Sequence, residues 1–289
     1  MNFSSSLQQL EAFQRVPPGP LVLFYEFSAG TPREAESCRQ ALAALARRHG
    51  GALRWAAAEE EVLAGRIAHF QQAGSLHFPS RAAAQAFVGH PDHAAAVACC
   101  TALQVAVLGE QPRVAALASK LMAKVLPLWP FDNAVEPGDE PGVDVSTVMP
   151  TSQAIAALRF HPEQTTPVVM INWLKFKPRA SYPAGTPPVS GKTAYHRYGK
   201  VAMTTTHSVG AKLIFAARYR QILIGNQGDP GVGLWDEFAL MQYPGRATFG
   251  RMAQLRRYRA GLADREAGLA EYGQGLTASK PEPEFVWRR

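Results

Sequence analysis

The chain has 289 residues, of which 47% are hydrophobic and 18% charged, so it can form a packed core and wholesale disorder is excluded. At roughly 100–200 residues per domain, this length predicts two domains or one large one. The longest apolar runs fall far short of the roughly 20 residues that span a bilayer, and the first 15 residues show no secretory signal. The three cysteines form neither a disulfide framework nor a CxxC pair. We therefore expect a cytoplasmic protein with reduced cysteines and no membrane partner.

The net charge of +7 is unevenly distributed along the chain. Residues 1–150 carry 11 Lys and Arg against 14 Asp and Glu, whereas residues 151–289 carry 19 against 9. A pI near 9.5 is typical of nucleic-acid-binding proteins. The basic residues are dispersed, however, and the aromatic residues lie mostly inside apolar runs, so no stacking platform is visible. We expect no nucleic-acid partner; the positive charge favours an anionic small substrate or docking between the two halves.

The first half of the chain alternates predicted strands and helices. Apolar runs mark the strands, and apolar residues at helical spacing mark the helices between them. The predicted elements are a strand over Leu21–Phe27, a helix over Arg33–His49, strands over Ala52–Gly65 and Ser75–Phe78, a helix over Arg81–Val88, a helical stretch over His93–Thr101 and a strand over Gln104–Leu108.

The second half repeats this order. Its predicted elements are a strand over Val168–Phe176, a helix over Thr193–Ser208, a strand over Lys212–Ile224, a glycine-rich turn over Gly225–Gly233, a strand over Leu234–Tyr243, a helix over Ala247–Leu255, a helical stretch over Leu262–Tyr272 and a strand over Leu276–Ala278. Each half therefore has the β-α-β-β-α-β order of a ferredoxin-like unit, whose helices cover one sheet face. Two such units can cover each other sheet to sheet and enclose a cavity.

The predicted organisation is thus an α+β protein of two fused ferredoxin-like repeats forming an intrachain dimeric α/β barrel. We place repeat one at residues 1–110, a connecting helix (Gln111–Leu126) and an acidic linker (Phe131–Gly142) within residues 111–147, repeat two at residues 148–279 and a tail at residues 280–289. The Pro-rich stretch Pro178–Gly191 is either a surface insertion or a lid over the cavity. Exposed edge strands offer a homodimer contact, although a monomer is equally compatible with the fusion.

Several segments of the second half follow one another in the order of a known family. They are Met149-Pro150-Thr151, VVMINWLKFKPRA, AYHRYGKVA, WDEFALMQYPGRATF and YRAGLADREAGL. Together they resemble the uncharacterised domain family numbered thirteen-thirty, in the dimeric α/β-barrel (EthD-like) superfamily, over roughly Met149 to Ser279. The first half resembles the same unit more loosely and lacks both the Asn-x-x-Lys-Phe motif and the Trp-Asp pair.

The resemblance implies a fold and leaves the chemistry open. Members of the superfamily usually dimerise into a barrel around a small, often aromatic or polyketide-like ligand. They include cofactor-independent monooxygenases, isomerases, cyclases, haem enzymes and lactone-type dehydratases or dehalogenases. On this resemblance the chain is a fused version of such a dimer.

The candidate catalytic residues lie in the second half. Asp236 and Glu237 are adjacent on a predicted strand, so one of them faces the cavity, where it acts as a general base or forms an ion pair with Arg218 or Arg220. Arg218 is also the natural partner of a developing oxyanion. Tyr195 and Tyr198 share a helix and either assist as acids or pack. His207 lies in the last turn of that helix, where the helix dipole stabilises a cation.

The candidate substrate-binding residues follow from strand alternation. Asn172 shares a face with Met170 and Leu174, and Trp173 and Lys175 share the opposite face. A polar Asn172 inside an apolar strand needs hydrogen bonds or serves a ligand, and Lys175 is either a solvated rim charge or an attractor of anions. Tyr25 and His77 of the first half stand at positions that can line the opposite wall. The full set is Asn172, Trp173, Lys175, Tyr219, Tyr25 and His77.

Other motifs do not satisfy the geometry of the sites they suggest. Residues 185–193 (GTPPVSGKT) resemble a phosphate-binding loop, but five residues separate the glycines where the motif needs four. His90 and His93 stand before a helix with no third metal ligand nearby, which indicates helix-start hydrogen bonding. Cys99 and Cys100 fall in an apolar run that is typical of a core. We therefore expect no metal site.

Three functions remain open. The leading hypothesis is a cofactor-independent enzyme that performs proton transfer, such as cyclisation, isomerisation or dehydration, on a small, largely apolar substrate. The second is a monooxygenase or oxidase, cofactor-free or with haem bound through a histidine such as His207. The third is a non-catalytic protein that binds a small molecule.

Overall fold

A computed structural model of the chain describes residues 13–109, 118, 121–122, 124–128, 134–135, 148–184, 186–225 and 235–286. Most of the predicted connecting helix, of the acidic linker and of the predicted glycine-rich turn falls outside these residues. In the described part, eight antiparallel strands form one closed barrel with helices on its outside, and the predicted mixture of helices and strands is confirmed. No described helix combines the length and the apolar character needed to cross a membrane.

The first half supplies four strands and the helices that cover them. These elements are β1 (Leu21–Ala29), α2 (Pro32–Arg48), β2 (Ala52–Ala64), β3 (Gln72–Phe78), α3 (Arg81–Val88), α4 (Pro91–Val97) and β4 (Cys100–Gly109). Helix α2 begins where the sequence provides a cap, since the Thr31 hydroxyl accepts a hydrogen bond from the Glu34 N–H at 3.2 Å and Pro32 opens the first turn. It ends before Gly50, whose φ of 73° is unfavourable for residues with a side chain.

The second half supplies the other four strands, preceded by short helical segments. These elements are η1 (Leu126–Leu128), α6 (Ser152–Arg159), β5 (Val168–Phe176), α7 (Gly191–Ser208), β6 (Lys212–Ile224), β7 (Glu237–Tyr243), α8 (Arg246–Ala253), α9 (Arg256–Gly268), β8 (Leu269–Pro281) and η2 (Pro283–Phe285). Helix α7 has a cap like that of α2, because the Ser190 hydroxyl accepts from the Thr193 N–H at 3.1 Å. It ends before Gly210, which has a φ of 85°.

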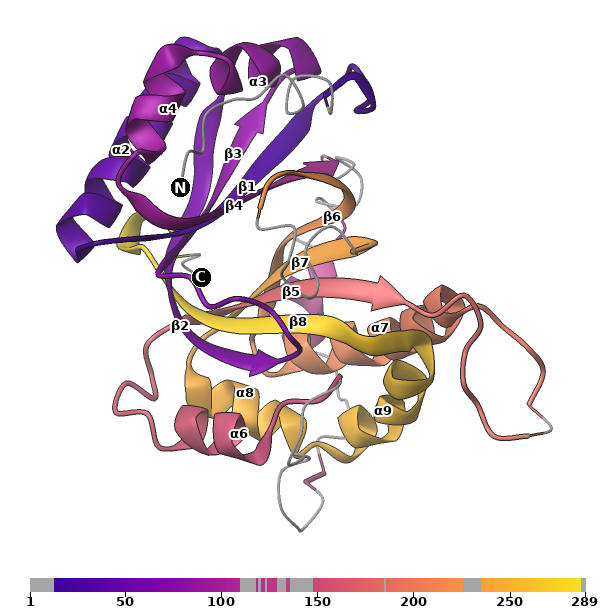
Figure 1. Cartoon of the computed structure of the whole chain (residues 1–289). Coiled ribbons are helices and arrows are strands. Elements are labelled where there is room, and N and C mark those ends of the chain that lie inside the picture. Colours follow the sequence, from indigo (N-terminus) through magenta and orange to yellow (C-terminus); the bar gives the residue numbers. More distant parts are fainter. Residues whose placement is uncertain are drawn as a thin grey trace.

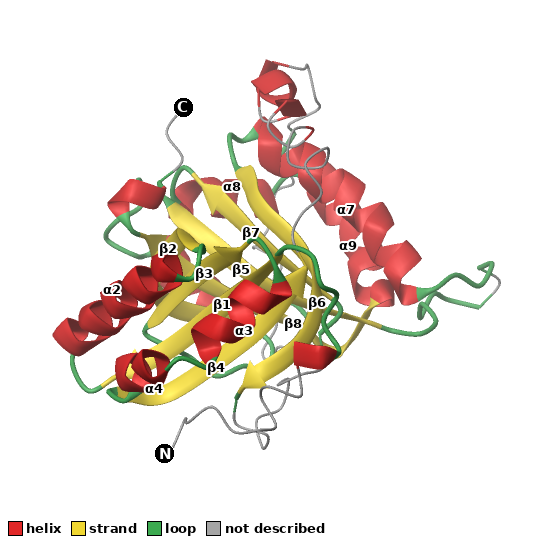
Figure 2. Cartoon of the chain, turned by 90° about the horizontal axis from the view of Figure 1, so that it is seen from above, coloured by secondary structure: helices red, strands yellow, loops and turns green. Residues whose placement is uncertain are grey.

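The barrel has the strand order β1-β3-β2-β8-β5-β7-β6-β4, with every neighbouring pair antiparallel. Two seams join the halves: β2 pairs with β8, and β4 pairs with β6. Helices α2, α3 and α4 cover the strands of the first half, whereas α6 to α9 lie on the opposite side of the molecule (Figure 1). Figure 2 shows the strands between these two groups. Closure gives each described strand two neighbours, so no described strand is a sheet edge along its whole length.

Strand alternation divides the core into an inside and an outside. On β1, Leu21, Leu23 and Tyr25 pack against the first-half helices, whereas Val22 and Phe24 belong to the cluster that fills the barrel. On β5, Met170 and Leu174 contact the second-half helices, and Trp173 points into the barrel. The predicted two faces of β5 are therefore confirmed, and the face with Asn172 is the one covered by helices.

The last strand differs most from the sequence prediction. The predicted helical stretch over Leu262–Tyr272 ends at Gly268, and the predicted short strand over Leu276–Ala278 is part of the 13-residue β8. A Cβ at Gly268 would lie 2.6 Å from the Gly191 carbonyl oxygen, so the close approach of α7 requires glycine there. Similarly, α4 ends at Val97 and β4 begins at Cys100, where a helical stretch over His93–Thr101 was expected.

Candidate functional site

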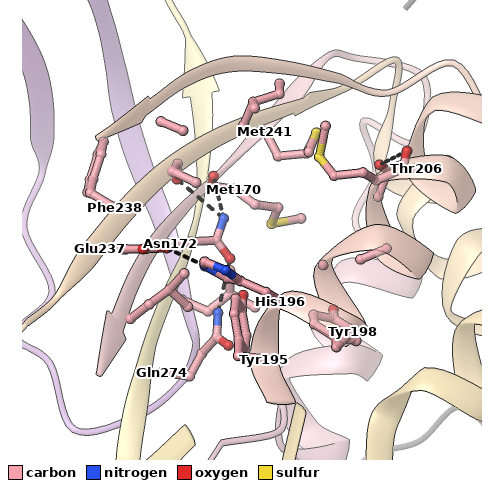
Figure 3. A pocket seen from close by; sticks show the side chains of 18 of the residues that line it. Met170, Asn172, Tyr195, His196, Tyr198, Thr206, Glu237, Phe238, Met241 and Gln274 are labelled. Carbon is pink, nitrogen blue, oxygen red and sulfur yellow. Dashed lines mark hydrogen bonds and ion pairs between the residues drawn. The ribbon is translucent and has the colours of Figure 1, made fainter. Parts of the chain in front are cut away.

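A cavity of about 810 Å³ lies between the helix-facing side of the second-half sheet and helices α7 and α9. Its walls are mostly apolar. The outward-facing residues of β5 to β8, which alternate with the residues that fill the barrel, form one of these walls. The main apolar side chains on the walls are Met170, Leu174, Met203, Leu213, Met241, Phe249 and Leu276. Figure 3 shows this cavity from close by. A cavity of this size and character fits a small, largely apolar organic molecule.

A buried arginine stands on the wall of this apolar cavity. Arg265 of α9 is 3% exposed, and its Nε and Nη2 atoms donate to Gln274 Oε1 at 3.3 and 3.0 Å. Its Nη1 atom donates to the sulfur of Met149. Both partners are neutral, and within the described part of the chain no carboxylate forms an ion pair with Arg265. A buried guanidinium without an acidic partner is costly, and an anionic ligand would offset that cost.

Gln274 links this arginine to Asn172. The Gln274 Nε2 atom donates to Asn172 Oδ1 at 3.0 Å, and Asn172 Nδ2 donates to the backbone oxygens of Met170 and Ala239 at 3.0 and 3.4 Å. These bonds are drawn in Figure 3. Both the oxygen and the nitrogen of the Asn172 amide group already have partners. These contacts orient Gln274 and, through it, Arg265. Asn172 is therefore better placed to position these side chains than to hold an oxyanion.

Three tyrosines stand beside the arginine. The hydroxyls of Tyr198 and Tyr258 are 3.0 Å apart, and Arg265 lies over the Tyr198 ring with its guanidinium carbon 5.9 Å from the ring centroid. The ring of Tyr195 lies tilted against that of Tyr198, with the centroids 5.3 Å apart, and Tyr195 also lines the cavity. Burial is the main cause that raises the pKa of Tyr195 and of Tyr198 above the ordinary value. Their hydroxyls therefore stay protonated at neutral pH and can donate hydrogen bonds to a ligand oxygen.

A glutamate and a histidine meet on the cavity wall. Glu237 opens β7, and its carboxylate lies 2.7 Å from Lys192 Nζ and 3.4 Å from His196 Nε2. Figure 3 shows His196 and Glu237 pointing toward one another. The Glu237 side chain is 22% exposed and that of His196 is 52% exposed, so this pair is reached from solvent. Arg218 and Arg220, both exposed on β6, line the cavity as well.

Asp236 does not join this group. Its carboxylate accepts from the Phe176 N–H at 2.9 Å and forms an ion pair with Lys175 at 3.0 Å. Neither Asp236 nor Lys175 lines the cavity. The expected ion pairs of Asp236 and Glu237 with Arg218 or Arg220 are replaced by pairs with Lys175, Lys192 and His196, although Arg218 lies opposite Glu237 in the register of β6 and β7. Of the two adjacent acids, only Glu237 faces the cavity.

Besides Lys175, four further predicted substrate-binding residues do not line the cavity. Trp173 and Tyr219 are inside the barrel with ring centroids 6.2 Å apart. His77 is in contact with Phe215 at one end of the barrel, and burial lowers its pKa to about 4. Tyr25 faces the first-half helices, where its hydroxyl bonds His93 Nε2 at 2.8 Å. These side chains do not form an opposite wall of the cavity, because the cavity lies outside the barrel.

The residues expected to hold haem do not fit that group. His207 is fully buried, and its Nδ1 atom bonds the Met203 carbonyl oxygen at 2.7 Å. Its Nε2 atom has no partner among the described residues, yet His207 does not line the cavity. His196 does line it, but its Nε2 atom faces Glu237. We therefore derive no chemistry through haem.

The sequence prediction missed the polar residues that carry the site: His196, Tyr258, Arg265 and Gln274. One signal was available for Arg265. It stands three and seven residues after Leu262 and Tyr258, so the three share one helix face, and an arginine within an apolar stripe indicates a buried charge. Gln274 lies in β8, where the sequence indicated a helix, and no local pattern places it next to Asn172.

A second group of buried acids lies inside the barrel. Glu26 of β1 is 3% exposed and accepts hydrogen bonds from Trp173 Nε1 at 3.2 Å and Gln104 Nε2 at 2.9 Å. Burial raises its pKa to about 7 against the opposing effect of these two donors. Glu59 of β2 is buried too, and burial followed by repulsion from Glu26 raises its pKa well above the ordinary value. The barrel interior therefore holds acids that retain protons near neutral pH.

Comparisons with known proteins return structural neighbours only. The chain matches no protein-family model and no curated protein. It is similar to a protein of unknown function from Rhodopseudomonas palustris, with 28% identity and a TM-score of 0.41 over 47% of this chain and 97% of that one. It is also similar to an anthrone oxidase-like protein (8% identity, TM-score 0.44, 93% of each chain). A further neighbour is a mutant chlorite dismutase from Candidatus Nitrospira defluvii (10% identity, TM-score 0.41, 96% of this chain and 97% of that one).

Proposed function

We propose that the chain is a small-molecule enzyme that binds a largely apolar organic anion in this cavity and transfers a proton on it without a bound cofactor. The observation that carries the proposal is Arg265, a buried cation that lines an apolar cavity and forms no ion pair with a carboxylate within the described residues. A substrate carboxylate or enolate oxygen would supply the missing negative charge. Arg218 and Arg220 add positive charge to the same cavity and favour the approach of an anion.

The same cavity offers groups for both halves of a proton transfer. The carboxylate of Glu237 orients His196, and the pair can take up a proton from an acidic C–H of the substrate. Arg265 and the protonated hydroxyls of Tyr195 and Tyr198 are donors for the oxygen on which charge develops. The reaction needs no other reactant, because the proton moves from a substrate carbon to the His196–Glu237 pair and returns to another substrate atom. Isomerisation, cyclisation and dehydration share this first step.

Replacing Glu237 tests the chemistry. With phenylpyruvate as probe, which combines an apolar ring, a carboxylate and an acidic C–H, the protein is expected to catalyse deuterium exchange at the acidic carbon. In Glu237→Gln, kcat/KM for this exchange is expected to fall by about 100-fold, as when a general base is lost. The measurement is the rate of exchange followed by nuclear magnetic resonance. Asp236→Asn is the matched control: it changes the adjacent acid, which lies off the cavity, and should keep the wild-type rate.

Two outcomes contradict the proton-transfer proposal. One is a rate of exchange in wild-type protein no greater than in buffer, for phenylpyruvate and for related enolisable keto acids. The other is equal activity in Glu237→Gln and wild-type protein when both have the same melting temperature. Tight binding of phenylpyruvate without exchange would instead make the cavity the site of a binding protein.

Replacing Arg265 tests the charge of the ligand. In Arg265→Met, the affinity for phenylpyruvate is expected to fall by about 10- to 100-fold, the value of a hydrogen-bonded charge contact. The affinity for phenylacetone, which lacks the carboxylate, should change little. Isothermal titration calorimetry measures both. Arg251→Met removes an exposed arginine of α8 and serves as the control, while Arg265→Lys retains the charge if the methionine variant does not fold. Equal losses for the acid and the ketone would contradict an anion site.

We further propose that the two halves are repeats of one ferredoxin-like unit, so that the barrel is a fused pair. The strand order β4-β1-β3-β2 in the first half has its counterpart in β8-β5-β7-β6 in the second, and this parallel supports the proposal. A closed barrel needs no second chain for its completion, which favours a monomer over a homodimer. We place the protein in the cytoplasm, where its three free cysteines remain reduced.

A further inference from the structure

The three cysteines of the chain lie together in the structure, although Cys38 is distant in sequence from Cys99 and Cys100. Cys38 comes from the middle of α2, whereas Cys99 and Cys100 stand at the start of β4. Their three sulfur atoms all lie within 4.8 Å of one another, and the sulfurs of Cys38 and Cys100 are 3.7 Å apart. None of them forms a disulfide. Three thiols from two elements thus form a single cluster on the side of the barrel opposite the cavity.

The cluster is buried on one side and open on the other. Cys38 and Cys100 are 2% and 7% exposed, and they pack in the apolar core between the first-half sheet and its helices. Cys99 is partly exposed, and the backbone oxygens of Glu34 and Ala96 lie 3.9 and 3.8 Å from its sulfur. A small molecule can therefore reach the cluster at Cys99 without opening the core.

The spacing of the sulfurs fits a three-coordinate centre. With bonds of about 2.3 Å, as in zinc thiolates, a planar three-coordinate centre holds its sulfurs about 4.0 Å apart, and a pyramidal one holds them closer. The observed 3.7 Å between Cys38 and Cys100 falls in this range. Modest side-chain rotations bring the remaining pairs, already within 4.8 Å, to the same spacing.

The absence of a charged contact at the thiols, within the described residues, favours a trivalent centre over a divalent one. Within the described residues, no hydrogen bond or ion pair joins a charged side chain to any of the three thiols, which contact one another and backbone oxygens beside an apolar core. Three thiolates around a divalent cation would leave one buried negative charge without a counter-ion. Three thiolates around a trivalent centre carry no net charge, so burial adds no such penalty.

We propose that Cys38, Cys99 and Cys100 form a binding site for a trivalent thiophilic centre, of which arsenic(III) is the representative. Arsenous acid, As(OH)₃, is itself uncharged and reacts with three thiols to form three arsenic–sulfur bonds. Each sulfur gives up its proton to a departing hydroxide, so three water molecules are released and no electron is transferred. The resulting complex ties α2 to the start of β4 and does not involve the cavity described above.

Native mass spectrometry of the reduced protein with arsenite tests this proposal. The expected product has one arsenic atom per chain and a mass increase of one arsenic less three hydrogens, which distinguishes three bonds from two. Cys38→Ser, Cys99→Ser and Cys100→Ser should each abolish that species, because two sulfurs leave a hydroxide on arsenic. Met252→Leu, which removes a buried sulfur elsewhere, should retain it. Arsenite should also raise the melting temperature of the wild-type protein, because it binds the folded state.

Three results would overturn the proposal. The first is formation of the same species in any of the single serine variants that melt at the wild-type temperature. The second is tighter binding of Zn²⁺ than of arsenite, which would show that the charge argument fails. The third is the absence of any arsenic adduct in protein whose three thiols are shown to be reduced by titration.

Discussion

Trp173→Ala is expected to reduce the free energy of unfolding by about 4 kcal/mol, the usual effect of truncating a buried tryptophan. Trp173 is 1% exposed and lies inside the barrel, with its ring centroid 4.5 Å from that of Phe238 and 5.6 Å from that of Phe24. Its truncation leaves a cavity between strands that cannot move closer without breaking the barrel. It also removes the hydrogen bond that the indole Nε1 atom donates to Glu26 Oε1 at 3.2 Å. Urea denaturation followed by circular dichroism measures the effect.

Tyr219→Phe is the matched control for this variant. Tyr219 contacts the same tryptophan, and its buried hydroxyl has no partner among the described residues. Removal of the hydroxyl should therefore leave the stability unchanged or raise it slightly. A loss below about 1 kcal/mol in Trp173→Ala would contradict the close packing of the barrel interior, since surface substitutions typically have effects of that size or less.

Glu26→Gln is expected to change how stability depends on pH. Burial raises the pKa of Glu26 from 4.5 in the unfolded chain to about 7 in the folded protein. Between these two values the folded state holds a proton that the unfolded state has released, so the wild-type protein loses stability as pH rises. The total loss across this window is about 3 kcal/mol, and it is complete above pH 7. The glutamine variant does not ionise and should avoid this loss.

The measurement is the free energy of unfolding of both proteins at intervals from pH 4.5 to 8. The difference between the variant and the wild-type protein should grow in favour of the variant as pH increases. Part of the change comes from Glu59, because removal of the Glu26 charge relieves the repulsion that raises the Glu59 pKa. Glu271→Gln, at an exposed position on β8, should follow the wild-type profile. Parallel profiles for Glu26→Gln and wild-type protein would show that Glu26 is not buried as described.

Much of the fold follows from local sequence signals. The alternation of apolar residues in Val168–Phe176 predicts both the strand and its two faces, because a strand places successive side chains on opposite sides. Thr31 and Gly50, like Ser190 and Gly210, mark the ends of two helices by hydrogen-bonding and backbone preferences that depend only on near neighbours. These signals predict the elements, and their repetition predicts the same order in both halves.

The path of β8 depends on distant contacts. Residues 269–281 include two glycines and a proline, which lower the local preference for a strand, yet they pair with β5 on one side and β2 on the other. The hydrogen bonds of two long neighbouring strands outweigh the local preference. For the same reason the sequence could not show that Gln274 of β8 would lie next to Asn172 of β5.

The candidate site was predicted in part because its residues lie on strands and a helix that the sequence predicts. Glu237, Arg218, Tyr195, Tyr198 and Asn172 all line the cavity. The roles of the residues are harder to predict, since Asp236 and Glu237 are adjacent and a shift of one residue in register exchanges their faces. Trp173 was assigned to ligand binding because the sequence analysis expected a cavity between the two sheets and left open which strand face lines it, whereas the cavity lies between the sheet and the helices.

The seam between β2 and β8 has a consequence for the order of events during synthesis. Ala57 pairs with Pro281, so the first strand of this seam must wait for a partner that is made 224 residues later. At translation rates of about 5–20 residues per second, this delay is roughly 10 to 45 seconds. Throughout that time β2 has an unpaired edge, the kind of surface that joins other nascent chains. The rate of translation therefore sets how long the chain is exposed to misassembly, and the barrel can close only after Pro281 has been added.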